Sequence, residues 1–193
     1  MAATVQPFTE ISAGALAKLI REDEKLMRLT DAVRQAADFR KAKTTMLPYV
    51  TPFGTFTRRR GDALVSLSGL IPVDIDGLES PDAAAEMRDI LFEDKMISPL
   101  LTFVSPSRNG VKCFVPMPPG GTVTASPDTL RDIAAWQESL SDYIDFKYLG
   151  SSRHKVDRSG KDMARACFIC HDRDAKSREY VQHFSQPKTK KDD

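Results

Sequence analysis

The spacing of apolar residues along the chain predicts four helices. In the first forty residues, apolar side chains recur three and four positions apart, and Ser12 and Thr30 stand where they can cap two such helices. Two further helices are predicted at Ser80 and Ser126, because each serine is followed by a proline, which suits the first turn of a helix. Between these helices lie shorter apolar segments whose length favours strands.

Apolar runs predict strands at five places: Leu64–Leu67, Leu70–Ile75, Leu100–Val104, Val111–Met117 and Ala164–Ile169. The stretch from the second strand to the third includes a helix and is long enough for a crossover between parallel strands. Prolines and glycines in residues 44–61 predict a loop or a short hairpin. This order of elements predicts a fold of the α+β class.

We expect a single domain over residues 1–185, because 193 residues are an ordinary size for one hydrophobic core. Within it, residues 1–62 are expected to form a smaller helical and αβ unit. Residues 63–172 are expected to form the core that carries the acidic residues. The polar end, residues 186–193, is expected to be a disordered tail.

The composition is that of a soluble globular protein, with 41% hydrophobic and 28% charged residues. The formal net charge is only +1, so a site that binds anions has to come from a local cluster of cations. No run of about 18 apolar residues is present, and the N-terminal residues lack the features of a secretory signal. Together with three cysteines, an odd number, these features predict a cytoplasmic protein with free thiols and no membrane partner.

The stretch Ser68–Leu78 carries the first candidate site. Asp74 and Asp76 are two positions apart at the end of an apolar run, so on a strand both side chains leave the same face. Neighbouring carboxylates repel each other and need a counter-ion or water, and carboxylate oxygens are typical ligands of hard cations such as Mg²⁺ or Mn²⁺. The same pattern is also typical of a strand that ends in a solvated turn.

Two later polar segments supply further candidates. Ser105–Lys112 offers hydroxyls, backbone N–H groups and cations between two strands, which suits the binding of phosphate oxygens. Asp157 is a candidate third carboxylate, and the guanidinium of Arg165 can hold a phosphate. Exposed polar loops have the same composition, and Asp162 and Asp172 compete with Asp157 as the third acid. Together the segments fit two-metal phosphoryl transfer, in which carboxylates hold cations about 3.5–4 Å apart.

Cations mixed with aromatic residues form a candidate nucleic-acid surface. The cations are Lys41, Lys43, Arg58, Arg59 and Arg60, and the aromatic residues are Phe53 and Phe56. Such surfaces bind single strands by phosphate neutralisation and base stacking. An exposed basic turn explains the pattern equally well.

Cys167–His171 spells C-x-x-C-H, the attachment pattern of c-type haem. We reject haem attachment because no export signal accompanies the pattern and the segment is predicted to be a buried strand. A structural zinc site needs about four ligands, and Cys113 is the only other cysteine.

The order of these segments resembles the catalytic domain of the archaeo-eukaryotic primase superfamily, the primase-polymerases. More closely, the chain resembles the VirE N-terminal or primase-like domain of bacterial mobile elements and phages, which often precedes a helicase. The similar segments are LPYVTPFGTF (47–56), SGLIPVDIDGL (68–78), SPSRNGVKCFVP (105–116) and DRSGKDMARACFICHD (157–172). The resemblance implies a split fold, in which an RRM-like mixed or antiparallel sheet with flanking helices carries the acids and a smaller N-terminal αβ unit packs on it.

The resemblance also implies a metal-dependent nucleotidyltransferase that makes or extends primers on single-stranded DNA from nucleoside triphosphates by two-metal phosphoryl transfer. Its catalytic residues and ligands of Mg²⁺ or Mn²⁺ would be Asp74, Asp76 and Asp157. Its nucleotide-binding residues would be Ser105, Ser107, Arg108, Asn109, Lys112 and Arg165. Classical primases have histidine where Lys112 stands, and related turns often have glycine where Arg108 stands.

The alternative function is a non-catalytic primase-like module that binds nucleic acid and works with the replicative helicase of a mobile element. The chain contains no Walker motif. If it is full length, we expect it to work with a separate ATPase, and if it is a fragment, we expect the missing part to be the motor. In either function we expect a monomer. Convergence of Asp74, Asp76 and Asp157 on one cation-sized space is the geometric expectation of the catalytic hypothesis.

Overall fold

The computed structural model describes four stretches of the chain: residues 9–117, 126–150, 156–158 and 163–179. Within them, helices and antiparallel sheets confirm the predicted α+β class. The split arrangement of a primase-polymerase stays a prediction. The tail expected over 186–193 lies outside the described residues.

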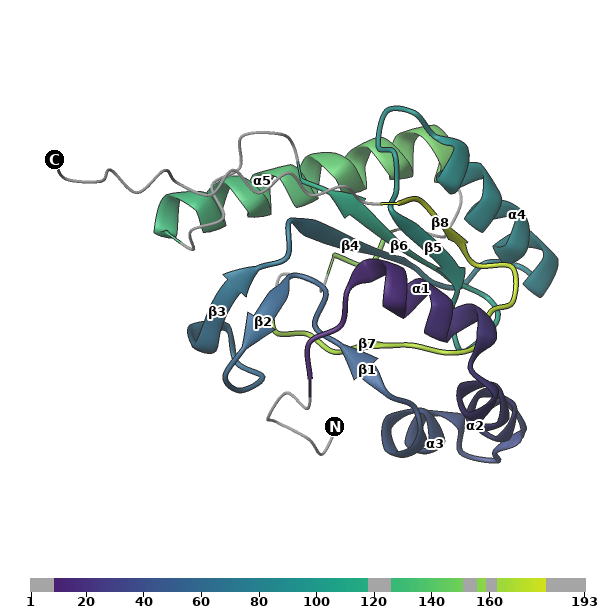
Figure 1. The fold of residues 1–193 in the computed structure, drawn as a ribbon. Helices are drawn as coiled ribbons and strands as arrows, with labels where there is room; N and C mark the ends of the chain where they lie inside the picture. Colours follow the sequence, from purple (N-terminus) through teal and green to yellow (C-terminus); the bar gives the residue numbers. More distant parts are fainter. Residues whose placement is uncertain (1–8, 118–125, 151–155, 159–162, 180–193) are drawn as a thin grey trace, which may run out of the picture.

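A four-stranded antiparallel sheet lies at the centre of the molecule (Figure 1). Its strands, in spatial order, are β4 (Leu70–Ile75), β6 (Val111–Pro116), β5 (Leu101–Val104) and β8 (Lys176–Ser177). Because β4 and β5 are both antiparallel to β6, they run parallel to each other with β6 between them. The strands predicted at β4, β5 and β6 and the crossover between β4 and β5 are therefore confirmed.

Helices cover both faces of this sheet (Figure 1). One hydrophobic cluster contains residues of α4 (Pro81–Glu93) and α5 (Pro127–Ile144), and the other contains residues of α1 (Ala13–Glu22), α2 (Glu24–Gln35) and α3 (Phe39–Met46). Side chains alternate along a strand, so β4 sends Ile71 and Val73 toward α4 and α5 and sends Leu70 toward α1 to α3. The same alternation places Asp74 on the side of Leu70.

The helices at Ser80 and Ser126 begin as predicted, with each serine hydroxyl accepting a hydrogen bond from a first-turn N–H group. The N-terminal region forms three helices where the sequence predicted two, and Ser12 caps α1 as predicted. Thr30 is not a cap but lies inside α2, where its hydroxyl donates to the carbonyl oxygen of Leu26 over 2.7 Å. Asp23 and Asp38 cap α2 and α3 instead, because their carboxylates accept first-turn N–H groups.

Two small sheets complete the fold. β2 (Gly54–Phe56) and β3 (Leu64–Leu67) pair as a hairpin. β2 lies in residues 44–61, where a loop or short hairpin was predicted, and β3 is the strand predicted at Leu64–Leu67. β1 (Tyr49–Val50) pairs with β7 (Cys167–Phe168) and so joins the N-terminal part of the chain to its C-terminal part. The strand predicted over Ala164–Ile169 is realised only as these two residues of β7.

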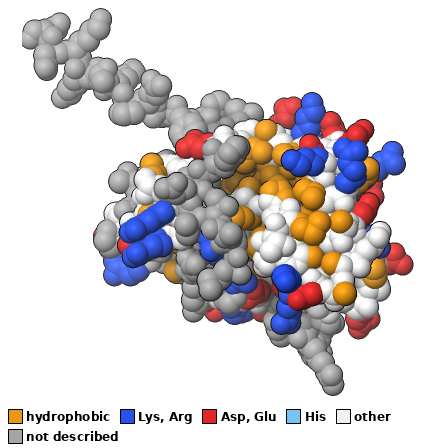
Figure 2. Space-filling model, turned by 90° about the horizontal axis from the view of Figure 1, so that it is seen from below, with side chains coloured by type: hydrophobic (Ala, Val, Ile, Leu, Met, Phe, Trp, Pro, Cys, Tyr) orange, Lys and Arg blue, Asp and Glu red, His pale blue; other side chains and the backbone are white. Residues whose placement is uncertain are grey.

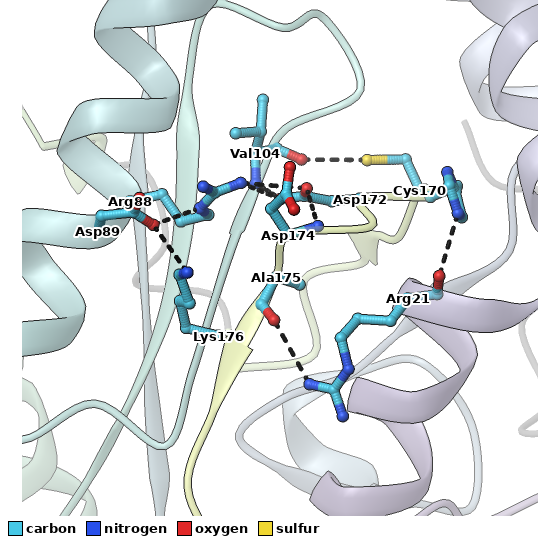
Figure 3. A network of polar contacts seen from close by, with 10 residues as sticks. Arg21, Arg88, Asp89, Val104, Cys170, Asp172, Asp174, Ala175 and Lys176 are labelled. Carbon is cyan, nitrogen blue, oxygen red and sulfur yellow. Dashed lines mark hydrogen bonds and ion pairs between the residues drawn. The ribbon is translucent and has the colours of Figure 1, made fainter.

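A polar network fixes the C-terminal segment against the sheet and α1 (Figure 3). The carboxylate of Asp172 accepts hydrogen bonds from Arg88 Nη1 at 3.2 Å and from the backbone N–H of Val104 at 2.8 Å. On the other side, Arg21 donates to the carbonyl oxygen of Ala175. Arg21 also donates to the hydroxyl of Ser177. The carboxylate of Asp172 therefore has a structural role in the fold. Among the described helices, none has the length and apolar character that a membrane crossing requires.

Candidate metal centre

Three carboxylates meet at the end of β4. Asp74, Asp76 and Asp157 each offer an oxygen atom, and these atoms all lie within 4.8 Å of one another. Val156 forms an isolated antiparallel bridge with Ile75, and the backbone N–H of Asp157 donates to the carbonyl oxygen of Asp74 over 2.8 Å. The strand end therefore carries two of the acids and holds the third by main-chain contacts. The trio expected from the sequence is brought together.

The donor set fits a hard divalent cation. Oδ1 of Asp74 is buried and has no hydrogen-bond partner in the described part of the chain. A buried acceptor without a partner is costly, and three close carboxylates repel one another. Burial, followed by the negative charge of Asp74, raises the pKa of Asp76, against the opposing charge of Lys112. A cation with oxygen ligands, such as Mg²⁺ or Mn²⁺, would satisfy Oδ1 and reduce the repulsion.

Lys112 lies directly opposite Asp74 in the register of β4 and β6. Its ammonium contacts Oδ2 of Asp74, and its side chain is only 10% exposed. Burial alone would lower the pKa of Lys112, but nearby negative charges, including those of Asp74 and Asp76, raise it above its ordinary value. In this structure the positive charge of Lys112 neutralises part of the acidic cluster.

The turn after β5 lies against the carboxylates. It is closed by hydrogen bonds from the N–H of Ser105 to the carbonyl oxygen of Gly110 and from the N–H of Arg108 to that of Ser105, and Ser107 contacts Ser105 through its hydroxyl at 3.0 Å. The carbonyl oxygen of Asn109 accepts from the N–H of Leu78, which follows the D-x-D stretch. The predicted phosphate-binding segment is therefore adjacent to the acids.

Two residues of this turn have backbone requirements. Arg108 has a φ of 67°, the left-handed region that favours glycine. Gly110, which the sequence did not single out, has no room for a side chain. A Cβ there would lie 2.5 Å from the carbonyl oxygen of Ile75, 2.9 Å from Oδ1 of Asp76 and 3.0 Å from the hydroxyl of Ser105. Gly110 thus permits the turn to approach Asp76.

Two arginines frame the site. Arg165 donates to Asp157 through Nη2 at 2.8 Å, so it is paired with the third acid. Arg34, in α2, donates through Nε to the carbonyl oxygen of Pro106 at 3.2 Å and so braces the turn from outside. Burial and the charge of Arg108 lower the pKa of Arg34. Sequence reasoning missed Arg34 because nothing near it in the chain signals a contact with a turn so distant in sequence.

The expected nucleic-acid-binding cations separate into two groups. Arg58 and Arg60 pair with Asp62 at the surface, and Lys41 is exposed on α3. Arg59 lies over the ring of Tyr49, and Lys43 lies over the rings of Phe39 and Phe168. The aromatic partners proposed for these cations were wrong: Phe53 and Phe56 are only 2% and 4% exposed, so neither ring can stack on a base.

Asp172 and the three cysteines are not members of the aspartate trio. Asp172 pairs with Arg88, and Asp162 lies outside the described residues. The three cysteines are free thiols, and burial raises the pKa of Cys167 to about 11 and that of Cys170 to about 12. In the described ranges the aspartate trio is the one cluster of metal-ligand side chains with suitable spacing.

Comparison with family models assigns the chain. The model of the BT4734-like N-terminal domain matches residues 41–176, which span the D-x-D stretch, the turn and Asp157. The chain belongs to this family. The matched range begins inside α3, so α1 and α2 precede it. No curated protein matches the chain, and no solved structure matches it.

Proposed function

We infer that this BT4734-like domain is a metal-dependent nucleotidyltransferase of the primase-polymerase type. The observation that carries the proposal is the convergence of Asp74, Asp76 and Asp157 within 4.8 Å, with Oδ1 of Asp74 buried and unpaired. Polymerases that use two metals need such a cluster beside a group that binds phosphates. The turn at Ser105–Gly110 and the nearby arginines supply a phosphate-binding group next to the acids.

Each part of the site has a role in this reaction. Asp74, Asp76 and Asp157 would hold a divalent cation, which would supply charge stabilisation for the phosphates and activation of the attacking hydroxyl. The hydroxyls of Ser105 and Ser107 and the side chain of Arg108 bind the triphosphate oxygens as hydrogen-bond donors. Lys112 holds Asp74 in place through its ion pair and limits the negative charge of the site. The 3′-hydroxyl of the primer, or the hydroxyl of a first nucleotide, would attack the α-phosphate and release its proton to water. The new P–O bond forms as the bond to pyrophosphate breaks, and pyrophosphate leaves.

One observation favours the alternative, a non-catalytic nucleic-acid-binding module that works with a helicase. Two of the three carboxylates have cationic partners, since Lys112 contacts Asp74 and Arg165 contacts Asp157. Side-chain cations that occupy these oxygens can replace a metal ion. In such a module, the three carboxylates and their cationic partners form a structural ion-pair network, and the protein still binds single-stranded nucleic acid.

The deciding experiment is nucleotide incorporation on single-stranded DNA, with and without a primer, in Mn²⁺ or Mg²⁺ and with labelled deoxynucleotides or ribonucleotides. The wild type should incorporate nucleotides, and Asp74→Asn should lose at least about a hundredfold in rate. Asp132→Asn is the matched control, because Asp132 is exposed on α5. If the wild type binds the oligonucleotide but incorporates nothing under any of these conditions, the module is correct.

A further inference from the structure

The ribbon formed by β1 and β7 presents two aromatic rings side by side. Tyr49 and Phe168 are directly paired in the register of the ribbon, and their ring centroids are 5.9 Å apart with an interplanar angle of 64°. Both side chains are half-buried, so part of each ring remains in contact with solvent. Rings that are partly exposed and held by strand pairing are suited to stacking on planar groups.

Two cations flank these rings. The ammonium of Lys43 lies 5.7 Å from the ring centroid of Phe168, and the guanidinium of Arg59 lies 5.7 Å from that of Tyr49. Nε of Arg59 is buried and has no hydrogen-bond partner among the described residues. We call Tyr49, Phe168, Lys43 and Arg59 the β1–β7 platform. The face of the molecule seen from below shows cationic side chains next to apolar ones (Figure 2).

The platform lies near the carboxylates. Arg165, which contacts Asp157 at 2.8 Å, stands three residues before Phe168. An extended chain advances about 3.3 Å per residue, so the Cα atoms of Arg165 and Phe168 are at most about 10 Å apart. One strand of nucleic acid can reach both places.

We propose that the β1–β7 platform holds single-stranded nucleic acid, with bases stacked on Tyr49 and Phe168 and phosphates neutralised by Lys43 and Arg59. Charge complementarity selects this occupant, because alternating cations and rings match alternating phosphates and bases. The path of the strand toward the carboxylates rests on the proposed function, but binding to the platform requires no metal. Arg58 and Arg60 contribute less, since Asp62 already neutralises part of their charge.

The test is fluorescence anisotropy of a labelled single-stranded oligonucleotide with the full chain in EDTA. Phe168→Leu and Tyr49→Leu keep apolar volume but remove a ring, and each should weaken binding by about tenfold. Phe92→Leu is the matched control, because Arg178 lies over the ring of Phe92 at 3.9 Å on α4, which packs on the other face of the sheet. Parallel titrations with DNA and RNA strands identify the preferred sugar.

A second pair of variants does not depend on core packing. Lys43→Gln and Arg59→Gln should each reduce the salt dependence of binding by about one phosphate contact, whereas Arg58→Gln should change it less. The proposal is overturned if the wild type does not bind the strand, or if the ring and cation variants all bind as the wild type does. If the wild type binds through the platform but incorporates no nucleotide, the proposed enzymatic function is wrong and the proposed binding to the platform still holds.

Discussion

The two carboxylate oxygens of Asp74 have different surroundings. Oδ2 contacts the ammonium of Lys112, while Oδ1 is buried without a hydrogen-bond partner in the described residues. A metal ion bound by the three aspartates would therefore take Oδ1 of Asp74 as a ligand, while Lys112 keeps its contact with Oδ2. Lys112 acts as an internal counter-ion when the metal is absent.

This arrangement predicts a coupling between Lys112 and metal binding. Lys112→Gln leaves a partly buried carboxylate without its partner, so the metal-free protein should lose about 3 kcal/mol of unfolding free energy. Mn²⁺ then replaces the missing charge, so the rise in melting temperature on adding Mn²⁺ should be larger for the variant than for the wild type. Calorimetry in EDTA and in saturating Mn²⁺ measures both quantities. Equal metal-induced shifts in the two proteins contradict this role of Lys112.

Some residues of the site could be predicted from the sequence, and others could not. Asp74 and Asp76 could be predicted because a two-residue spacing on a strand places them together. Asp157 was a candidate among several acids, and it is the main-chain contacts of Val156 and Asp157 with β4 that place it, rather than Asp172, at the site. Arg34 could not be predicted, because its contact with the turn depends on how α2 packs.

Among the elements, the turn at Ser105–Gly110 depends on the absence of a side chain at Gly110. Gly110→Ala should destabilise the protein by about 1–3 kcal/mol and weaken metal binding, because its Cβ displaces Oδ1 of Asp76 or the backbone of Ile75. Gly14→Ala is the control, since a Cβ there has no neighbour within 4 Å. Urea denaturation measures stability, and Mn²⁺ titration measures affinity. A Gly110 variant as stable as the Gly14 variant contradicts the close approach.

Polar contacts around Asp94 join the end of α4 to the π-helical turn Asp145–Leu149, which follows α5. The Asp94 side chain is 1% exposed. Burial alone would raise the pKa of Asp94. Hydrogen bonds from Tyr148, the backbone N–H of Met96, Lys147 and Tyr143 outweigh burial and hold this pKa at about 2.

This depressed pKa predicts a pH-dependent contribution to stability. An acid whose pKa is lower in the folded state stabilises the fold above its unfolded pKa of about 4 and loses that contribution as the pH falls toward the folded pKa. Asp94→Asn should therefore cost about 2 kcal/mol at pH 7, and the difference from the wild type should shrink between about pH 4 and pH 2. Denaturation across this pH range provides the measurement. A difference that does not change with pH would mean that the charge of Asp94 is irrelevant.

Elements with local signals could be predicted, and elements without them could not. Serine followed by proline marked the starts of α4 and α5, and apolar runs marked β4, β5 and β6. The strands β1, β7 and β8 are two residues long, too short to show any periodicity. The cap predicted at Ser12 is confirmed, whereas the one predicted at Thr30 was wrong, because Asp23 is an equally suitable cap residue and α2 begins after it.

For the whole molecule, the central sheet is buried between two helical layers. Leu101, Phe103 and Phe114 are buried in the same cluster as Leu16 and Ile20 of α1. The family match covers 41–176 and so omits α1 and α2. The α+β class could be predicted from the order of elements. That helices cover both faces of the sheet could not be predicted, because it depends on which side chains pack together.

This packing predicts that a chain starting at residue 41 does not fold stably. Removing α1 and α2 uncovers one face of the sheet, and each fully buried large apolar side chain contributes about 1.5–3 kcal/mol. The shortened chain should lack a cooperative thermal transition and bind a hydrophobic dye, whereas the full chain should melt cooperatively. Circular dichroism and dye fluorescence make the comparison. A sharp transition in the shortened chain would show that α1 and α2 are dispensable.

The central claim is that Asp74, Asp76 and Asp157 bind a divalent cation. The most direct measurement is Mn²⁺ binding to the metal-free full chain, followed by electron paramagnetic resonance, for the wild type, Asp76→Asn and the control Asp132→Asn. The wild type and the control should bind Mn²⁺ equally, and Asp76→Asn should bind at least about tenfold more weakly. If Asp76→Asn binds Mn²⁺ as tightly as the wild type, or if the wild type binds none, the carboxylate trio is not a metal site.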